Sequence, residues 1–154
     1  MGVRNHANIV HIIDFSLVKQ FRSHDMHLHI PFHGGLGITG TLLFASNNSH
    51  ASWELDRQDN FESLAYILIY FMYWNLPWGH FSDPAIIAQQ KLGCSVEKLC
   101  WGLPTEFTTF LSYSCSLQFE DKPVTVMSAS CLTTCNSMRD SRMMLPSIGF
   151  HYPQ

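Results

Sequence analysis

An apolar stretch between Asp59 and Trp78 constrains the fold more than any other part of the sequence. Apolar side chains occur on every face of the helix that this stretch would form, namely Phe61, Leu64, Ala65, Ile67, Leu68, Ile69, Phe71 and Met72. A helix that is apolar all round either crosses a membrane or lies at the centre of a core. The run is shorter than the roughly 20 apolar residues of a comfortable membrane span. We therefore predict a fully buried central helix.

Both ends of this helix carry local signals. Asp59 followed by Glu62 has the spacing of a capping box, which places the helix start near Asn60. The exit reads Asn-Leu-Pro-Trp over 75–78. Because Pro77 lacks a backbone N–H and has a fixed φ, we predict a rigid turn there.

The remaining chain predicts short elements and long connections. A β-branched run over Asn8–Phe15 favours a strand, and a His- and Gly-rich stretch over Ser23–Thr41 favours a long loop. Helices are predicted near Ser52–Leu55, from Asp83 and Pro84 to Lys91, over Ser95–Trp101, and over Pro104–Leu117. The fold class is therefore mainly α, with a short β-strand or hairpin at the N-terminus.

Composition limits the classes of partner. At 154 residues a single domain is expected. Charged residues make up 14% of the chain, well below the usual value of about 25%, which favours large buried faces or faces that bind a partner. The net charge of −3 gives no strong attraction to nucleic acid or to a membrane surface.

The start of the chain and its cysteines indicate a compartment. Met1–Val10 is polar and irregular, unlike a signal peptide, so we expect a cytoplasmic or nuclear protein with reduced thiols. Cys131 and Cys135 have the spacing of half a metal site, but no second pair follows them. We favour free thiols.

Several motifs together resemble the casein kinase 1 family of Ser/Thr protein kinases. Asn8–Lys19 resembles the metal-binding strand and turn of a kinase. The later motifs follow in family order: His29-Ile-Pro-Phe, Thr39-Gly-Thr, Ala45-Ser-Asn-Asn, Glu62-Ser-Leu, Leu76-Pro-Trp, Leu99-Cys, Glu106-Phe and Leu117-Gln-Phe-Glu-Asp-Lys-Pro. One such motif has little weight, but this many in register do not arise by coincidence.

The resemblance implies a partial kinase domain over 1–123, the C-lobe from the metal-binding strand onward, with an irregular tail over 124–154 that we expect to be poorly ordered. The family's N-lobe, hinge and catalytic loop would all precede Met1. The central helix would be the buried helix on which a kinase C-lobe is built. The family uses ATP and Mg²⁺ to phosphorylate Ser and Thr in proteins.

The resemblance also assigns roles to particular residues. Asp14 takes the Mg²⁺-binding position, although an acid that caps a turn is an equal alternative. The family's activation segment corresponds to Thr39, Gly40, Thr41, Ser46 and Asn48, and structural positions correspond to Glu62, Pro77 and Trp78. Ser16 stands where the family has glycine, so the metal turn would be strained if it kept a positive φ there.

Other family groups are missing or replaced. The sequence contains no His-Arg-Asp triplet and no lysine matching that of the third kinase strand. Gly35–Gly40 reads Gly-x-Gly-x-x-Gly, but the next lysine is Lys91, so we do not assign a phosphate loop. A substrate-binding arginine is replaced by Leu43, and two bracing positions hold Asn60 and Cys115.

Four histidines crowd one loop: His24, His27, His29 and His33. Their spacing could chelate zinc or copper, but an ordered site also needs supporting partners. We favour a solvated polar loop.

The predicted function is that of an inactive, truncated pseudokinase that resembles casein kinase 1 and binds no ATP or Mg²⁺ productively. The alternatives are a non-catalytic module that binds a protein partner through an exposed C-lobe surface and a partial gene product. Neither nucleic acid nor a membrane is expected as a partner.

Overall fold

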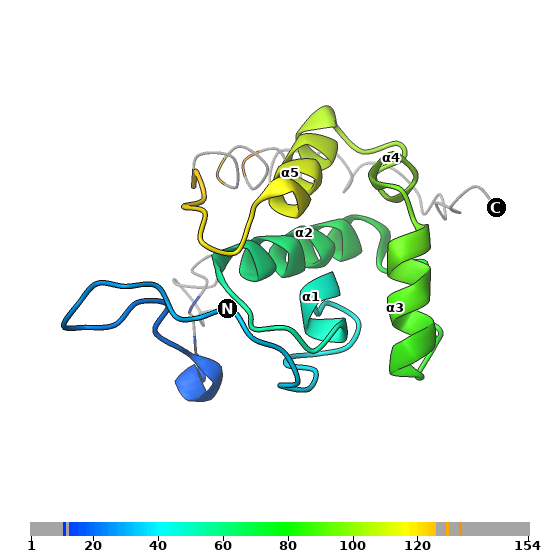
Figure 1. Ribbon diagram of the computed structural model, residues 1–154. Helices are drawn as coiled ribbons and strands as arrows, with labels where there is room; N and C mark the ends of the chain where they lie inside the picture. The colour runs from blue at the N-terminus through cyan, green and yellow to red at the C-terminus, as the bar shows by residue number, and fades with distance from the viewer. Residues whose placement is uncertain (1–10, 12, 126–128, 130–132, 134–154) are drawn as a thin grey trace. The chain divides into compact units, whose positions relative to one another are not determined.

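The computed structural model describes residues 11, 13–125, 129 and 133 (Figure 1). The described residues are mainly helical, with two isolated β-bridges, so the mainly α class is confirmed. The elements are η2 (Phe15–Leu17), α1 (Asn47–His50), α2 (Arg57–Tyr73), α3 (Pro84–Gly93), α4 (Val96–Leu99) and α5 (Thr105–Ser116).

The chain divides into two compact units, one up to Ile30 and one from Pro31 onward. In the first unit, η2 is a single 3-10 turn, and a bridge between Arg22 and His29 closes a small hairpin. The strand predicted over Asn8–Phe15 lies largely outside the described residues. Its described positions, 11 and 13–15, contain no strand, and Phe15 belongs to η2. The described hairpin therefore lies later in the chain than the predicted strand.

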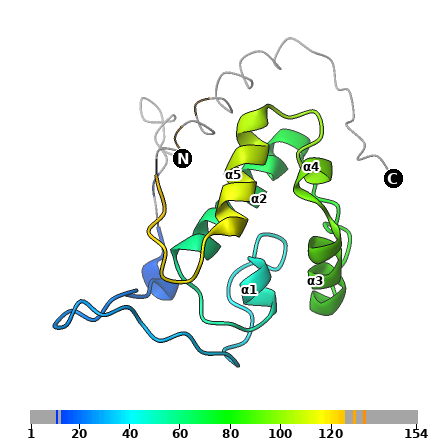
Figure 2. The ribbon, with the colours of Figure 1, turned by 45° about the horizontal axis from the view of Figure 1, so that its top comes forward.

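The second unit is built around α2. α5 packs along α2, α1 contacts both α2 and α3, and α4 contacts α5 (Figures 1 and 2). The buried core contains Ala65, Tyr66, Leu68, Ile69, Met72, Leu76, Trp78, Ile87, Leu99, Cys100, Phe107, Phe110 and Leu111. Helices gather round α2 because its apolar residues need cover on more than one face.

The predicted cap of the central helix is one turn too late. α2 begins at Arg57, and the capping box is formed by Asp56 and Asp59, with the Asp56 backbone N–H donating to Asp59 Oδ2 at 2.8 Å. Glu62 lies further along α2, and its buried carboxylate accepts a hydrogen bond from Asn47 of α1 rather than capping the helix. Both acidic pairs have the i, i+3 spacing of a capping box, so spacing alone could not choose between them.

The central helix is largely but not fully buried. Ile69 is completely buried, whereas Phe71 is 57% exposed and Trp74, the C-cap residue, is 75% exposed. No helix in the described part of the chain combines the length and the hydropathy that a membrane crossing requires. The prediction of full burial is therefore wrong for one side of the C-terminal end of α2.

The other helices follow the predicted order. α3 has Asp83 as its N-cap and Pro84 in its first turn, and α4 and α5 lie within their predicted ranges. The short helix predicted near Ser52–Leu55 is wrong, because the helical turn is α1, capped by the Ser46 side chain. Beyond residue 125 the structure describes only residues 129 and 133, so the prediction for the tail lies outside the described part.

Candidate functional site

The turn that leads into α1 is fastened to the buried carboxylate of Glu62. Glu62 Oε1 accepts from the Asn47 backbone N–H at 3.1 Å, from Asn47 Nδ2 at 2.8 Å and from the Tyr66 hydroxyl at 2.7 Å. Burial raises the pKa of Glu62, and the hydrogen bonds from Tyr66 and Asn47 partly oppose that rise. Glu62, predicted as a structural residue, therefore joins α1 to α2.

A second buried carboxylate lies beside the same turn. The Asp59 side chain caps α2 by accepting from the Asp56 backbone N–H, and the side chains of Ser46 and Asn48 lie near it. Burial raises the pKa of Asp59, whereas the Asp56 N–H and the Ser46 and Asn48 side chains act in the opposite direction. Ser46 and Asn48, two of the predicted activation-segment residues, thus meet at the first turn of α2.

Lys91 supplies a buried cation that the sequence prediction did not assign to this region. Its Nζ donates to the backbone carbonyls of Leu42 at 3.1 Å and Ala45 at 2.6 Å. The same atom lies 4.9 Å from the ring centroid of Tyr66 and 5.2 Å from that of Trp78, within cation–π range. Burial lowers the pKa of Lys91 to about 8, although the negative charge of Glu62 opposes the shift.

A sequence signal for this lysine existed. Lys91 follows Ile87 by one helical turn on α3, and Ile87 is a core residue. Residues at i and i+4 share one face of a helix, so Lys91 had to face inward unless its side chain snorkelled to water. The two carbonyls and two aromatic rings explain why it stays inside.

The turn at 75–78 closes the same region. Trp78 is 1% exposed, and its Nε1 donates to the Leu43 carbonyl at 2.9 Å. Pro77 is half-buried next to it. A Cβ on Gly79 would lie 2.7 Å from Asn75 Oδ1 and 3.1 Å from the Leu76 carbonyl, so a larger residue there would have to displace the Asn75 side chain. The Gly79 backbone N–H donates to the Leu76 carbonyl at 2.8 Å, so the chain does turn at Pro77 and Trp78, and the rigidity of this turn stays a prediction.

The loop before α1, residues 34–41, is exposed at its glycines and is hydrogen-bonded to α1 at Thr39. The Thr39 backbone N–H donates to Ser49 Oγ at 2.9 Å, and Ser49 Oγ donates to the Thr39 carbonyl at 2.9 Å. Gly40 follows at a φ of +93°, and Thr41 is exposed. Gly35 and Gly37 also have positive φ with open space around them, and no helix begins directly after Gly40.

Asp14 acts as a turn cap in the structure. Its carboxylate Oδ1 accepts from the Ser16 backbone N–H at 3.3 Å. The Ser16 side chain first, and this backbone N–H second, lower the pKa of the exposed Asp14. The positive φ of this turn is 63° at Asp14 itself, so Ser16 is not the residue under backbone strain. The geometry matches the turn-cap alternative for Asp14.

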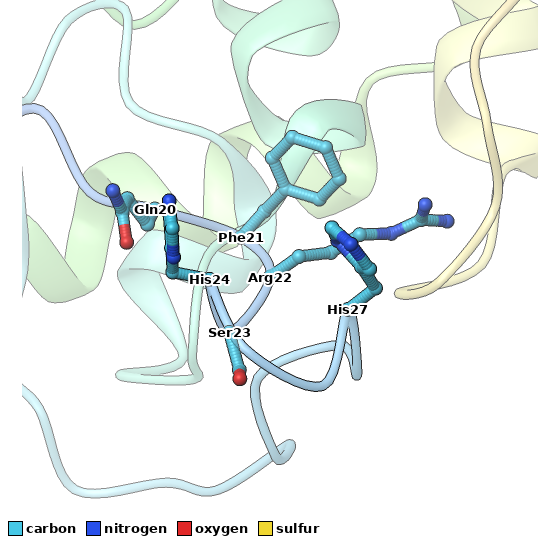
Figure 3. Close-up of a pocket in the computed structure, with 6 residues that line it drawn as sticks. All are labelled: Gln20, Phe21, Arg22, Ser23, His24 and His27. Atoms are coloured by element: carbon cyan, nitrogen blue, oxygen red, sulfur yellow. The ribbon is translucent and has the colours of Figure 1, made fainter.

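Two histidines of the predicted loop, His24 and His27, line a pocket of the first unit. Figure 3 shows a pocket of the first unit lined by Gln20, Phe21, Arg22, Ser23, His24 and His27, in which the rings of His24 and His27 stand apart. Within the described residues, no three His, Cys, Asp or Glu side chains are grouped so that they could hold a metal ion. Cys131 and Cys135 lie outside the described residues.

The pairing of His33 with Glu54 was also missed. His33 Nε2 lies 3.1 Å from Glu54 Oε2, and the Glu54 side chain is only 3% exposed. A buried carboxylate is costly without a partner, but sequence spacing does not say which loop residue will meet it.

No protein-family model matches the sequence of this chain.

Proposed function

We propose that this chain is related to the C-lobe of casein kinase 1-like protein kinases and works as a non-catalytic module. The observation that carries the proposal is the contact of Ser46, Asn47 and Asn48 with the buried Asp59 and Glu62 of α2. These are positions where the resemblance expects the end of an activation segment and the buried C-lobe helix.

Two further contacts support the same relationship. Trp78, in the Leu-Pro-Trp turn, donates to Leu43 of the segment before α1. Lys91 of α3 donates to Leu42 and Ala45 in that segment. Contacts from α2, from the Leu-Pro-Trp turn and from α3 therefore hold one stretch of backbone in place, and the motifs of the resemblance include the first two of these elements.

The chemistry of these residues favours a non-catalytic role. Phosphoryl transfer needs metal ligands, a lysine on the phosphates and an acid that positions the hydroxyl group. Asp14 caps its own turn through one oxygen, and Lys91 is held on carbonyls inside the second unit. Within the described residues neither group is joined by the other parts of a Mg²⁺–nucleotide site, so we propose that these 154 residues do not transfer phosphate by themselves.

A direct assay tests this proposal. The purified chain is incubated with radiolabelled ATP, Mg²⁺ and an acidic protein substrate, beside an active casein kinase 1 as positive control. We expect no transfer and no ATP-dependent rise in melting temperature. Turnover that Asp14→Asn abolishes and Asp83→Asn preserves would refute the non-catalytic assignment. Asp83 is the matched control for Asp14, because both carboxylates are exposed and cap a turn or a helix.

A protein-binding role has its own observation. Phe71, Trp74 and Trp101 are exposed by 57%, 75% and 67%, and the Tyr73 hydroxyl, on α2 beside Trp74, donates to the Trp101 carbonyl. Exposed aromatic groups of this size are enriched where proteins bind one another. Self-association is the simplest test: a concentration-dependent elution volume that Trp74→Ser removes would support this role, and a monomer at all concentrations would argue against self-association.

A further inference from the structure

Two basic side chains meet at one backbone carbonyl, that of Leu42. Lys91 Nζ, from α3, donates to this oxygen at 3.1 Å, and His50 Nε2, from the last residue of α1, lies 3.2 Å from the same oxygen. A carbonyl oxygen can only accept, so the His50 ring must carry a proton on Nε2 to make this hydrogen bond. Two nitrogen groups that can each become positively charged therefore share one acceptor.

The other nitrogen of the His50 ring has no such acceptor. His50 Nδ1 is buried and makes no hydrogen bond with the residues that the structure describes. While Nε2 holds the proton of the neutral ring, Nδ1 holds only a lone pair. A second proton would turn Nδ1 into a buried donor of a charged ring, and an unsatisfied buried donor carries a full desolvation penalty. The contacts of His50 therefore fit the neutral ring and disfavour the imidazolium form.

The charged groups around this contact disfavour the imidazolium form as well. Burial of the ring and the positive charge of Lys91 lower the pKa of His50, and the hydrogen bond to Leu42 only partly opposes this shift. On α2, the negative charge of Glu62 favours the charged form of Lys91. Residues 42–45 include no titratable side chain. The contact therefore holds one positive charge and resists a second.

Two buried carboxylates of α2 also take up protons in acid, but their effect on stability has the opposite sign. Burial raises the pKa of Glu62 and of Asp59, so their protonation favours the folded chain as the pH falls. The pKa of His50 is lowered in the folded chain, so its contribution to stability is lost as the pH falls below the ordinary value of 6.5. A loosening in mild acid is therefore the signature of His50.

We propose that His50 forms an acid-sensitive contact between α1 and the 42–45 segment: the neutral ring holds the Leu42 carbonyl, and a proton on Nδ1 drives the ring away from it. Mild acid then loosens α1 from the segment that Lys91 and Trp78 also contact. This device uses only groups of the second unit, and it does not depend on the proposed function of the chain.

NMR titration of the His50 ring in the full chain tests the protonation states. We expect the ¹⁵N shifts at pH 7.5 to show a proton on Nε2 and none on Nδ1. The second proton should bind at a lower pH than it does at His80, an exposed histidine of the second unit. Lys91→Met removes the neighbouring charge and should move the titration of His50 upward, whereas Lys98→Met, at an exposed lysine, should leave it unchanged.

Amide hydrogen exchange of the full chain at pH 7.0 and pH 5.0 measures the loosening. The readouts are the amides of His50 and Ala51, which donate to carbonyls within α1. After correction for intrinsic exchange, we expect their protection to fall several-fold at pH 5.0. His50→Gln has an amide that can still donate to Leu42 but cannot titrate, so it should remove this fall. His80→Gln is the matched control and should keep it.

Four results would overturn the proposal. The first two are a His50 ring with its proton on Nδ1 at pH 7.5, and a His50 ring that titrates no lower than the ring of His80. The others are equal protection of both amides at pH 7.0 and pH 5.0 in the unaltered chain, and a fall in protection that survives in His50→Gln. If that variant does not fold, the ring titrations of the unaltered chain decide.

Discussion

Asn47 uses both its backbone N–H and its side-chain amide to donate to one oxygen of the buried Glu62 carboxylate, at 3.1 and 2.8 Å. The Tyr66 hydroxyl donates to the same oxygen at 2.7 Å. One carboxylate therefore satisfies donors from α1 and α2, and its loss would leave them buried without an acceptor.

Glu62→Ala should lower the free energy of unfolding by about 2–4 kcal/mol, because buried donors without acceptors carry a full desolvation penalty. Glu62→Gln should lose less, because the amide oxygen can still accept. Glu120→Ala, at an exposed glutamate, is the matched control and should change stability by less than about 0.5 kcal/mol. Urea unfolding followed by circular dichroism measures all three. Equal losses for Glu62→Ala and Glu120→Ala would contradict the role of Glu62.

Loss of the Trp78 hydrogen bond should lower the free energy of unfolding more than the same substitution at an exposed tryptophan. Trp78→Phe removes the donor to the Leu43 carbonyl and leaves a small cavity, so we expect a loss of about 1–3 kcal/mol. Trp101→Phe, at a side chain that is 67% exposed, should be close to neutral. Thermal melts of the two variants at one protein concentration make the comparison, and a larger loss for Trp101→Phe would refute the assignment.

Lys91 should give a stability that rises with pH just above neutrality. The pKa of Lys91 is about 8 in the folded chain and 10.5 for an ordinary lysine. Between these values the unfolded chain binds more protons than the folded chain, so stability increases as pH rises. We expect the urea midpoint to move upward between pH 7.5 and pH 8.5.

Lys91→Met should flatten that rise, and Lys98→Met, at an exposed lysine of α4, should retain it. The range stops at pH 8.5 because burial also raises the pKa of three thiols, that of Cys94, that of Cys100 to about 11 and that of Cys115 to about 12. Toward pH 9 the unfolded chain loses thiol protons that the folded chain keeps, and stability then falls. A midpoint that drops steadily from pH 7.5 to pH 8.5 would contradict the burial of a charged Lys91.

Gly34→Ala should loosen the contact under Trp53. A Cβ at Gly34 would lie 2.8 Å from Trp53 Cζ3 and 2.9 Å from Cε3, so the ring must move. Because Trp53 is 43% exposed and its ring can shift toward solvent, we expect a loss of about 1 kcal/mol, at the lower end of the cost of overpacking. Gly93→Ala, where nothing lies within 4 Å of the added carbon, should be neutral or slightly stabilising. Denaturation midpoints of both variants check this, and equal midpoints would argue against a tight contact at Gly34.

The sequence predicted the helical elements well where the signals were local. Asp83 before Pro84 marks the start of α3, and the apolar spacing of Phe107, Phe110 and Leu111 marks α5. These signals need only neighbours along the chain, so they can be read without a fold. The capping box failed because Asp56, Asp59 and Glu62 repeat the same spacing, and the choice between them depends on what covers Glu62.

The sequence by itself determined that an apolar helix near the middle of the chain needs neighbours on several faces, since its side chains leave no wholly polar face. Only the tertiary structure decided which polar groups accompany it inside. Lys91 meets Leu42 and Ala45, and His33 meets Glu54, across long stretches of chain. Such partners are selected by the desolvation of buried charges after the chain has closed, and no local pattern records that selection.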